Sequence, residues 1–211
     1  SPDEAASAGR VELVRGLGLV TGKTVYSVAS TPTVSVRSEG FREVVRDIQP
    51  NELGRTITVV LEPLPGRIDA ATIRALPETR WRIDEDLVAI ATGIDREMKA
   101  GTYALTVNHR HFQVIEQSVE LERGKTKKLR LDLAAVDGRI SINSKPAGAQ
   151  IFLDTRKIGV TPLEMSLAGG YHQLRIVAPD RQPVEETVQI TNTAPLIERQ
   201  YNLKPISSTL K

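Results

Sequence analysis

Two histidines, His109 and His111, have the spacing of a candidate metal site. If they lie on a strand, a spacing of two residues places both imidazoles on one face, where they can chelate a metal ion. A structural zinc site takes about four ligands, so this pair alone is incomplete. The competing interpretation is that both histidines lie in a loop before Phe112. We favour the loop and expect no bound metal.

Three successive carboxylates, Asp84-Glu85-Asp86, with Asp95 nearby, are the candidate calcium ligands. Calcium takes clustered oxygen ligands, but an EF-hand-like loop has acidic residues at alternate positions and a glycine in the middle. Neither feature is present in this stretch. The sequence therefore predicts a solvated hairpin tip.

The one basic run, residues 123–128 (Arg-Gly-Lys-Thr-Lys-Lys), contains a Gly-Lys-Thr string that suggests a phosphate loop. The leading glycine of that motif is missing, and the run lies between two predicted strands instead of between a strand and a helix. We therefore exclude nucleotide binding. A contact with anionic glycan or lipid head groups stays open, although a solvated turn commonly carries this many cations.

Aromatic residues make up only 4% of the chain, which limits the stacking surface that a glycan-binding module uses. We expect Trp81 and Tyr103 to point into the core. Serine, histidine and aspartate occur, but none lies in a nucleophile-elbow or carboxylate-pair context. The sequence thus predicts a protein that is not an enzyme and needs no cofactor. The notable aromatics are Trp81, Tyr103, Phe152, Tyr171 and Tyr201.

Composition sets further bounds. The 211 residues are 40% hydrophobic and 26% charged, enough for one or more buried cores. A net charge of +2 is too small to indicate a nucleic-acid partner. With no cysteine, the chain has neither disulfides nor thiolate metal ligands, which fits an oxidising compartment. No apolar run reaches the roughly 18–20 residues of a membrane span, and the first four residues are not a signal peptide.

The pattern of apolar residues predicts an all-β chain. Apolar residues alternate with polar ones, and turn signals recur every 8–12 residues, as in a sandwich. Only Asp84–Ala91 is compatible with a short helix. The clearest stretch is Gly138 to Leu203, where Pro146 and Gly148 occupy the second and fourth positions of a predicted type I turn. Ala149, Ile151 and Leu153 then alternate as one face of a strand.

This stretch resembles the PEGA domain, an envelope module of bacteria and archaea. The resemblance lies in three segments: residues 146–149 (Pro-Ala-Gly-Ala), 159–163 (Gly-Val-Thr-Pro-Leu) and 169–172 (Gly-Gly-Tyr-His). The sequence departs from the family at Thr155, where a turn glycine is usual, and near Pro179. The predicted structural positions of the motif are Pro146, Gly148, Ala149, Asp154, Gly159, Thr161, Pro162 and Gly170.

Internal recurrence suggests tandem small antiparallel β-sandwich repeats of this PEGA-like kind. A Gly-Arg-(Val/Ile) opening occurs at Gly9, Gly66 and Gly138. In the middle copy Trp81 and Ile83 take the places of Ile151 and Leu153, and a hairpin from Val114 to Leu133 closes it. The predicted domains are a disordered lead (1–8), a degenerate or truncated repeat (9–65), a diverged repeat (66–137), a clear PEGA domain (138–205) and a tail (206–211).

The resemblance implies a non-catalytic spacer or protein-interaction module of a cell envelope, periplasmic or at the cell surface, within a larger membrane-anchored or secreted chain. Short joints at 61–66 and 133–138, the first stiffened by Pro63 and Pro65, predict a semi-rigid rod. Partners would be other domains of the same chain or envelope proteins. The alternatives are a module binding peptidoglycan or another envelope glycan, and an auxiliary domain of a kinase or a formylglycine-generating-enzyme-like domain.

Overall fold

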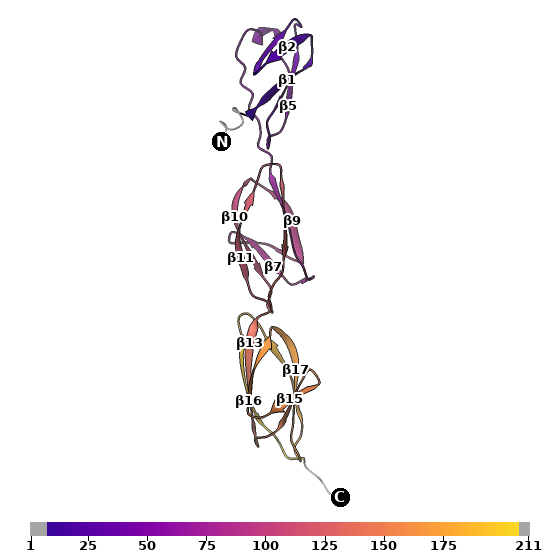
Figure 1. Ribbon diagram of the computed structural model, residues 1–211, viewed down its shortest axis with the longest axis vertical. Coiled ribbons are helices and arrows are strands. Elements are labelled where there is room, and N and C mark those ends of the chain that lie inside the picture. The colour runs from indigo at the N-terminus through magenta and orange to yellow at the C-terminus, as the bar shows by residue number, and fades with distance from the viewer. Residues whose placement is uncertain (1–7, 207–211) are drawn as a thin grey trace. The chain divides into compact units, whose positions relative to one another are not determined.

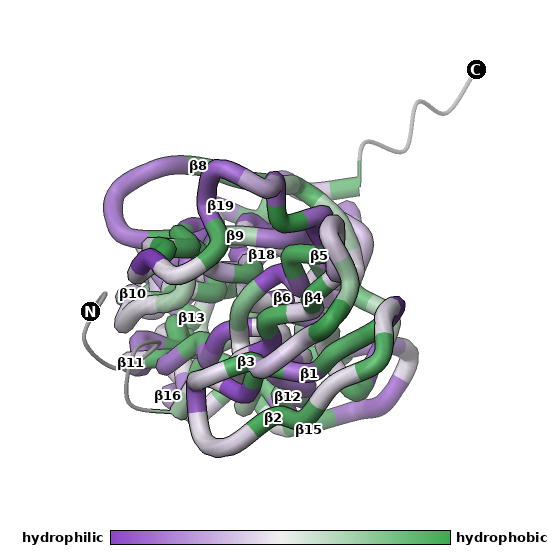
Figure 2. Tube along the Cα trace, turned by 90° about the horizontal axis from the view of Figure 1, so that it is seen from above, coloured by the Kyte–Doolittle hydropathy of each residue, from purple (hydrophilic) through white to green (hydrophobic). Residues whose placement is uncertain are grey.

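A computed structural model describes residues 8–206, and strands dominate this part of the chain (Figure 1). It contains nineteen strands and one short 3-10 helix, η1 (Pro50–Glu52). Buried residues recur at every second position of strands such as Gly66–Thr72 and Asp137–Lys145, as expected for sheets with one buried face. Hydrophobic and hydrophilic stretches are interspersed along the trace (Figure 2). The predicted all-β fold class is confirmed. No helix among the described residues is long and apolar enough to cross a bilayer.

The chain divides into two compact units whose boundaries cut through strands of the middle repeat. One unit holds the residues up to Ala71 together with Gly93–Ala104 and Ser118–Arg130. The other holds Thr72–Thr92, Leu105–Gln117 and the residues from Leu131 onward.

The C-terminal part of the second unit is a sandwich of two sheets. Strand β13 (Asp137–Lys145) is central in the first, antiparallel to β16 (Leu163–Ala168) and parallel to β19 (Leu196–Asn202). The second sheet has the order β15-β14-β17-β18. These strands are β14 (Gln150–Leu153), β15 (Arg156–Val160), β17 (Gly170–Val177) and β18 (Val184–Ile190).

Both sheets contribute to one core, because alternate residues of strands such as β13 and β17 are buried against the opposite sheet. Ile140 and Ile142 of β13 are completely buried, as are Ile151 of β14 and Ile176 of β17. Burying such side chains is the main stabilising contribution in a domain of this size, about 1.5–3 kcal/mol each. The alternating apolar residues predicted between Gly138 and Leu203 therefore do form a buried core.

The middle repeat has two sheets of the same strand order, β12-β6-β9 and β11-β10-β7-β8. Trp81 of β7 faces Val107 of β10 just as Ile151 faces Ile176, which matches the predicted alignment. The strands are β6 (Gly66–Thr72), β7 (Arg80–Ile83), β8 (Asp86–Ile90), β9 (Gly93–Met98), β10 (Gly101–Asn108), β11 (Ile115–Leu121) and β12 (Thr126–Leu131).

One local expectation in the middle repeat is confirmed and one is wrong. The predicted hairpin tip exists, as an exposed turn at residues 84–85 between β7 and β8, and the rest of Asp84–Ala91 contains strand β8 and no helix. The predicted closing hairpin is an arch, because β11 and β12 join different sheets. The turn at Glu122–Lys125 exists, with the amide of Lys125 donating to the carbonyl of Glu122.

The first repeat contains a three-stranded sheet, β1-β4-β5, and a separate hairpin of β2 and β3. Val11 of β1 faces Val36 of β4 in the register that pairs Ile151 with Ile176. The Gly-Arg-Val opening at Gly9 thus begins the counterpart of β14, not of β13 as the recurrence predicted. The strands are β1 (Arg10–Arg15), β2 (Gly18–Thr21), β3 (Thr24–Ser27), β4 (Thr33–Arg37) and β5 (Val44–Asp47).

An isolated bridge lies after the same strand in each repeat. Phe41 pairs with Pro63, Phe112 with Ala135, and Arg181 with Pro205. Each bridge joins the loop after β4, β10 or β17 to the last residues of its repeat. This recurrence supports three copies of one pattern.

Candidate functional site

The PEGA-like corner is held by two buried hydroxyls. Ser144 Oγ lies 2.6 Å from the carbonyl of Pro146 and 2.6 Å from Thr161 Oγ1. Thr161 Oγ1 also accepts the amide hydrogen of Ala149 at 3.1 Å. Because the single proton of Ser144 is used on Pro146, Thr161 must donate its own proton to Ser144. The corner is therefore a closed chain of hydrogen bonds.

Backbone bonds complete the corner. The amide of Gly148 donates to the carbonyl of Thr161, and the amide of Thr161 to that of Ala149, both at 2.9 Å. Gly148 has φ of +81°, where a side chain is strained, so its identity follows from the turn. The peptide bonds preceding Pro146 and Pro162 are both cis.

The middle repeat contains a related corner without those prolines. Thr72 Oγ1 bonds the carbonyls of Arg74 at 2.6 Å and Thr92 at 3.1 Å. The amide of Ala91 donates to Thr79, as that of Thr161 does to Ala149. The hydroxyl at the end of the first strand is thus the shared feature, and the sequence analysis did not assign it a role.

The β14–β15 turn is joined to β17 by Asp154 and His172. Asp154 accepts the amide hydrogen of Gln173 at 2.8 Å and lies 2.8 Å from Nδ1 of His172, whose Nε2 lies 3.0 Å from the carbonyl of Ala168. The bond from His172, followed by that from Gln173, lowers the pKa of Asp154. Thr155, the departure from the family pattern, adopts φ of +73°.

The other two predicted motif glycines have different constraints. A Cβ on Gly159 would meet Leu163 at 3.4 Å, which is an ordinary contact. Gly170 is constrained by its backbone, which has φ of +151°. Two glycines outside the predicted set are far more crowded. A Cβ on Gly169 would lie 2.0 Å from the carbonyl oxygen of His111, and one on Gly138 would lie 2.4 Å from Ile190.

His109 and His111 lie in the predicted loop, where hydrogen bonds occupy nitrogens that a metal would need. Nδ1 of His109 accepts the backbone amide of His111 at 3.4 Å. Nε2 of His111 lies 2.9 Å from the side-chain amide nitrogen of Gln189, which can only donate. His111 is therefore neutral, with its proton on Nδ1. Within residues 8–206, no three or more histidine or acidic side chains are arranged so that they could hold a metal ion.

Residues of the last domain form hydrogen bonds with the loop that carries these histidines. We call this contact the joint; it consists of residues 108–112 with 169 and 189–192. Asn192 Nδ2 donates to Asn108 Oδ1 at 2.8 Å and to the carbonyls of His109 and Phe112, both at 3.2 Å. The backbone amide of Asn192 donates to Arg110 at 2.8 Å. No sequence signal marked Asn192, because its partners are about 80 residues away.

We expect the joint to weaken as the pH falls. Burial is the main cause that lowers the pKa of both His109 and His111. Arg110 lowers both pKa values further and His109 lowers that of His111, whereas Glu78 acts in the opposite direction on both. A histidine whose pKa is lower in the folded state than in the unfolded state makes its full contribution to the stability of the fold at pH values above its unfolded pKa of about 6.5. This contribution is lost as the pH falls below that value and through the folded pKa. The melting temperature should therefore drop between pH 7.5 and 5, and less so in His111→Gln; equal slopes would contradict this.

The remaining candidate ligands are dispersed or paired. Asp95 forms two bonds with Arg67, at 2.6 and 2.7 Å, away from the Asp84 turn. In the basic run, Lys125 bonds Glu122 at 2.5 Å, and the guanidinium of Arg123 lies 4.9 Å from the centre of the Phe41 ring. Trp81 is completely buried and donates to the carbonyl of Ala91 at 2.9 Å, as a core residue does.

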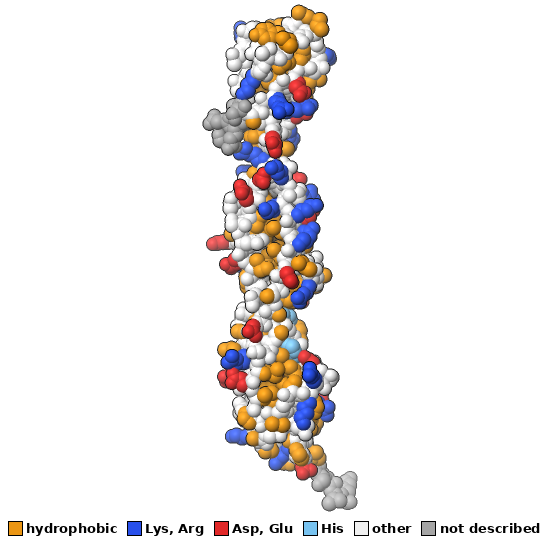
Figure 3. Space-filling model, viewed as in Figure 1, with side chains coloured by type: hydrophobic (Ala, Val, Ile, Leu, Met, Phe, Trp, Pro, Cys, Tyr) orange, Lys and Arg blue, Asp and Glu red, His pale blue; other side chains and the backbone are white. Residues whose placement is uncertain are grey.

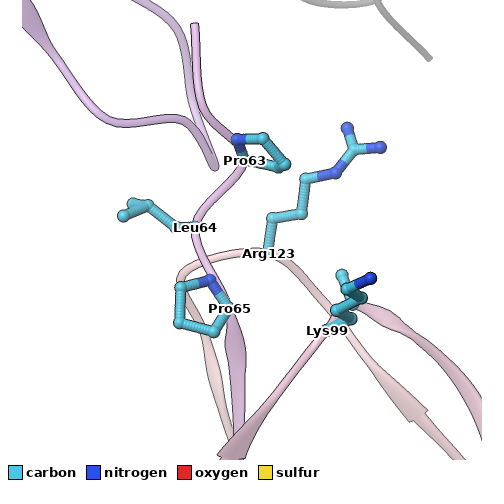
Figure 4. Close-up of a pocket in the computed structure, with 6 residues that line it drawn as sticks. Pro63, Leu64, Pro65, Lys99 and Arg123 are labelled. Atoms are coloured by element: carbon cyan, nitrogen blue, oxygen red, sulfur yellow. The ribbon is translucent and has the colours of Figure 1, made fainter.

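A shallow pocket lies beside the basic turn in the first unit (Figure 4). Arg123 and Lys99 are at its edge, and the proline-rich segment forms its wall. Its lining belongs to exposed turns, and none of the lining residues brings a buried polar side chain into the pocket. The lining residues are Pro63, Leu64, Pro65, Lys99, Ala100 and Arg123.

Comparison with known proteins supports the C-terminal assignment. Residues 137–207 match the PEGA domain family. The chain is similar to a solved structure described as the Bacillus anthracis TIE protein, with 12% sequence identity and a TM-score of 0.46. The similarity covers 83% of this chain and 41% of that one. No curated protein matches the sequence.

Proposed function

We propose that this chain, with a PEGA domain at residues 137–207, is a non-catalytic spacer of a cell envelope that holds its neighbours at a fixed separation. The PEGA match indicates an extracellular or envelope-associated module. The finer role rests on one observation, the joint. There the side chain of Asn192 bonds one side chain and two backbone carbonyls of the loop at 108–112.

Such a contact fixes an orientation because it bonds backbone atoms, which have little freedom to move. The carbonyl of His111 accepts the amide of Val136, and the amide of Gly169 donates to Val136 in turn. Because Gly169 has no side chain, its backbone can lie close to the carbonyl of His111. A tether alone needs none of these bonds, whereas a spacer that keeps its geometry does.

Spin-label distances test this role directly, because the chain has no cysteine and accepts two introduced ones. Labels at Glu85→Cys and Lys157→Cys, both exposed, report across the joint. We expect a narrow distance distribution that broadens in Asn192→Ala. The matched control is Thr193→Ala in the same loop, where the hydroxyl bonds only its neighbour Thr191 among the described contacts. An equally broad distribution in the parent chain would contradict the proposal.

Scattering in solution tests the spacer role for the whole chain. A compact chain of 211 residues has a radius of gyration of about 17 Å. If the repeats are held end to end, the measured radius should clearly exceed this value. A value at the compact figure would mean that the repeats fold back on one another.

A further inference from the structure

Strand β8 (Asp86–Ile90) has one edge that no other described strand covers. It is the last strand of the sheet β11-β10-β7-β8, and it pairs only with β7. The backbone groups along its other edge therefore have no strand partner among residues 8–206. The PEGA domain has the same open edge at β15 (Arg156–Val160), so this edge belongs to the ordinary strand order of the repeat.

The sequence of β8 lacks the charges that protect the corresponding edge of the PEGA domain. The two strands have the same pattern of burial and the same bulge, opposite β7 in one case and β14 in the other. In this shared register, Lys157 of β15 occupies the position of Leu87 in β8. Charged side chains, lysine above all, keep an edge strand from pairing with another chain. β15 begins with Arg156 and Lys157, whereas the stretch Leu87–Ile90 carries no charge.

Two apolar side chains of β8 are exposed beside this edge. Leu87 is 52% exposed and Ile90 is 57% exposed. In the register with β7 they lie next to Arg82 and Arg80, which are exposed because Trp81 between them points into the core. Figure 3 shows hydrophobic and charged side chains together at the surface of the middle repeat. A strand added at this edge would pack its own side chains against Leu87 and Ile90, which removes apolar surface from water.

The two ends of β8 lie beside charges of opposite sign. Glu85 and Asp86 are exposed at the start of β8, whereas its last residue, Ile90, is paired with Arg80 of β7. Arg82 lies between these ends. Neither Arg80 nor the two acidic residues form an ion pair with another residue in the described part of the chain. An antiparallel neighbour with the same sequence would therefore match these charges.

We propose that β8 pairs with β8 of a second copy of this chain, antiparallel and about a two-fold axis. In the symmetric register that matches the exposed faces, Leu87 of each copy lies opposite Ile90 of the other. The acidic start of each β8 is then about 10 Å, or two strand spacings, from Arg80 of the other copy. Backbone hydrogen bonds across the new pair supply the affinity. The proposal goes beyond the spacer role and does not depend on it.

Sedimentation of the full chain measures this self-association, because the mass should double as the chain concentration increases. Hydrogen exchange identifies the strand. Amides of residues 87–90 should exchange more slowly in the dimer, and those of residues 157–160 should exchange at the same rate. A mass that stays that of one chain up to about 1 mM, the Kd of a very weak contact, would overturn the proposal. So would a dimer in which residues 87–90 gain no protection.

A lysine placed at one edge or the other tests which strand pairs. Leu87→Lys gives β8 the residue found at the corresponding position of β15, so the Kd of the dimer should rise at least about tenfold. Val160→Lys is the matched control, because Val160 is 48% exposed and has the place in β15 that Ile90 has in β8. It should leave the Kd unchanged, and unchanged melting temperatures verify the fold of both variants. Equal weakening in the two variants would contradict the proposed site.

Exchanging the charges tests the antiparallel orientation. Arg80→Glu alone and Glu85→Arg alone should each weaken the dimer, because each substitution brings like charges together across the two-fold axis. The variant with both changes restores opposite charges and should regain the affinity of the parent chain. Added salt should weaken the parent dimer and that of the double variant alike, since these charges are exposed. A double variant that associates no better than the single ones would overturn the proposal.

Discussion

Gly138→Ala is expected to lower the free energy of unfolding by about 1–3 kcal/mol, the usual cost of overpacking a core. The new Cβ would lie 2.4 Å from Cγ2 of Ile190 and 2.7 Å from the carbonyl oxygen of Pro195. Ile190 is completely buried and the carbonyl belongs to the backbone, so neither can move aside cheaply. Denaturant unfolding of the full chain measures the loss.

Gly159→Ala is the matched control, because it adds the same atom to another strand of the same domain. Its Cβ would meet Leu163 at 3.4 Å, and no positive φ opposes the substitution. We expect stability to be unchanged or slightly raised. If Gly159→Ala were as damaging as Gly138→Ala, space around the glycine would not be the cause.

Removing one hydroxyl of the corner is expected to cost about 1–3 kcal/mol, because its partner is left buried and unsatisfied. Ser144→Ala leaves the hydroxyl proton of Thr161 without an acceptor. Thr161→Val removes the bond that Ser144 accepts and leaves the amide of Ala149 without a partner. Both side chains are buried, at 7% and 2% exposure.

The double variant distinguishes a network from two separate contacts. The bond between the two hydroxyls is lost in each single variant but only once in the double variant. Ser144→Ala with Thr161→Val should therefore cost less than the two single losses added together. Urea unfolding of the four proteins provides the coupling energy. Strict additivity would show that the two hydroxyls act independently.

Much of the sandwich could be predicted from the sequence because strand alternation is a local property. The alternation of Ile151 and Leu153 indicates which face of their strand is buried. Trp81 occupies the position in the middle repeat that Ile151 occupies in the last domain. These positions need no knowledge of distant partners. The chain does change direction at Pro146–Gly148, but not in the predicted type I turn, because the amide of Gly148 donates to the carbonyl of Thr161 instead of that of Lys145.

Features that depend on long-range pairing were missed. A hairpin and an arch share the same local turn at Glu122–Lys125, and only the choice of sheet separates them. The Gly-Arg-Val match at Gly9 failed because three residues at a strand start do not identify which strand begins. The hydrogen bonds of Asn192 join segments that are 80 or more residues apart in the sequence. No local sequence pattern predicts such bonds.

The parallel pairing of β13 with β19 has a mechanical consequence. The first and last strands of the PEGA domain along the chain lie side by side over seven residue pairs, from Arg139–Leu196 to Lys145–Asn202. Because the strands are parallel, a pull on the start of β13 and the end of β19 slides one along the other. The bonds between them then share the load and must break together instead of one at a time. The domain is thereby built to carry tension along its chain.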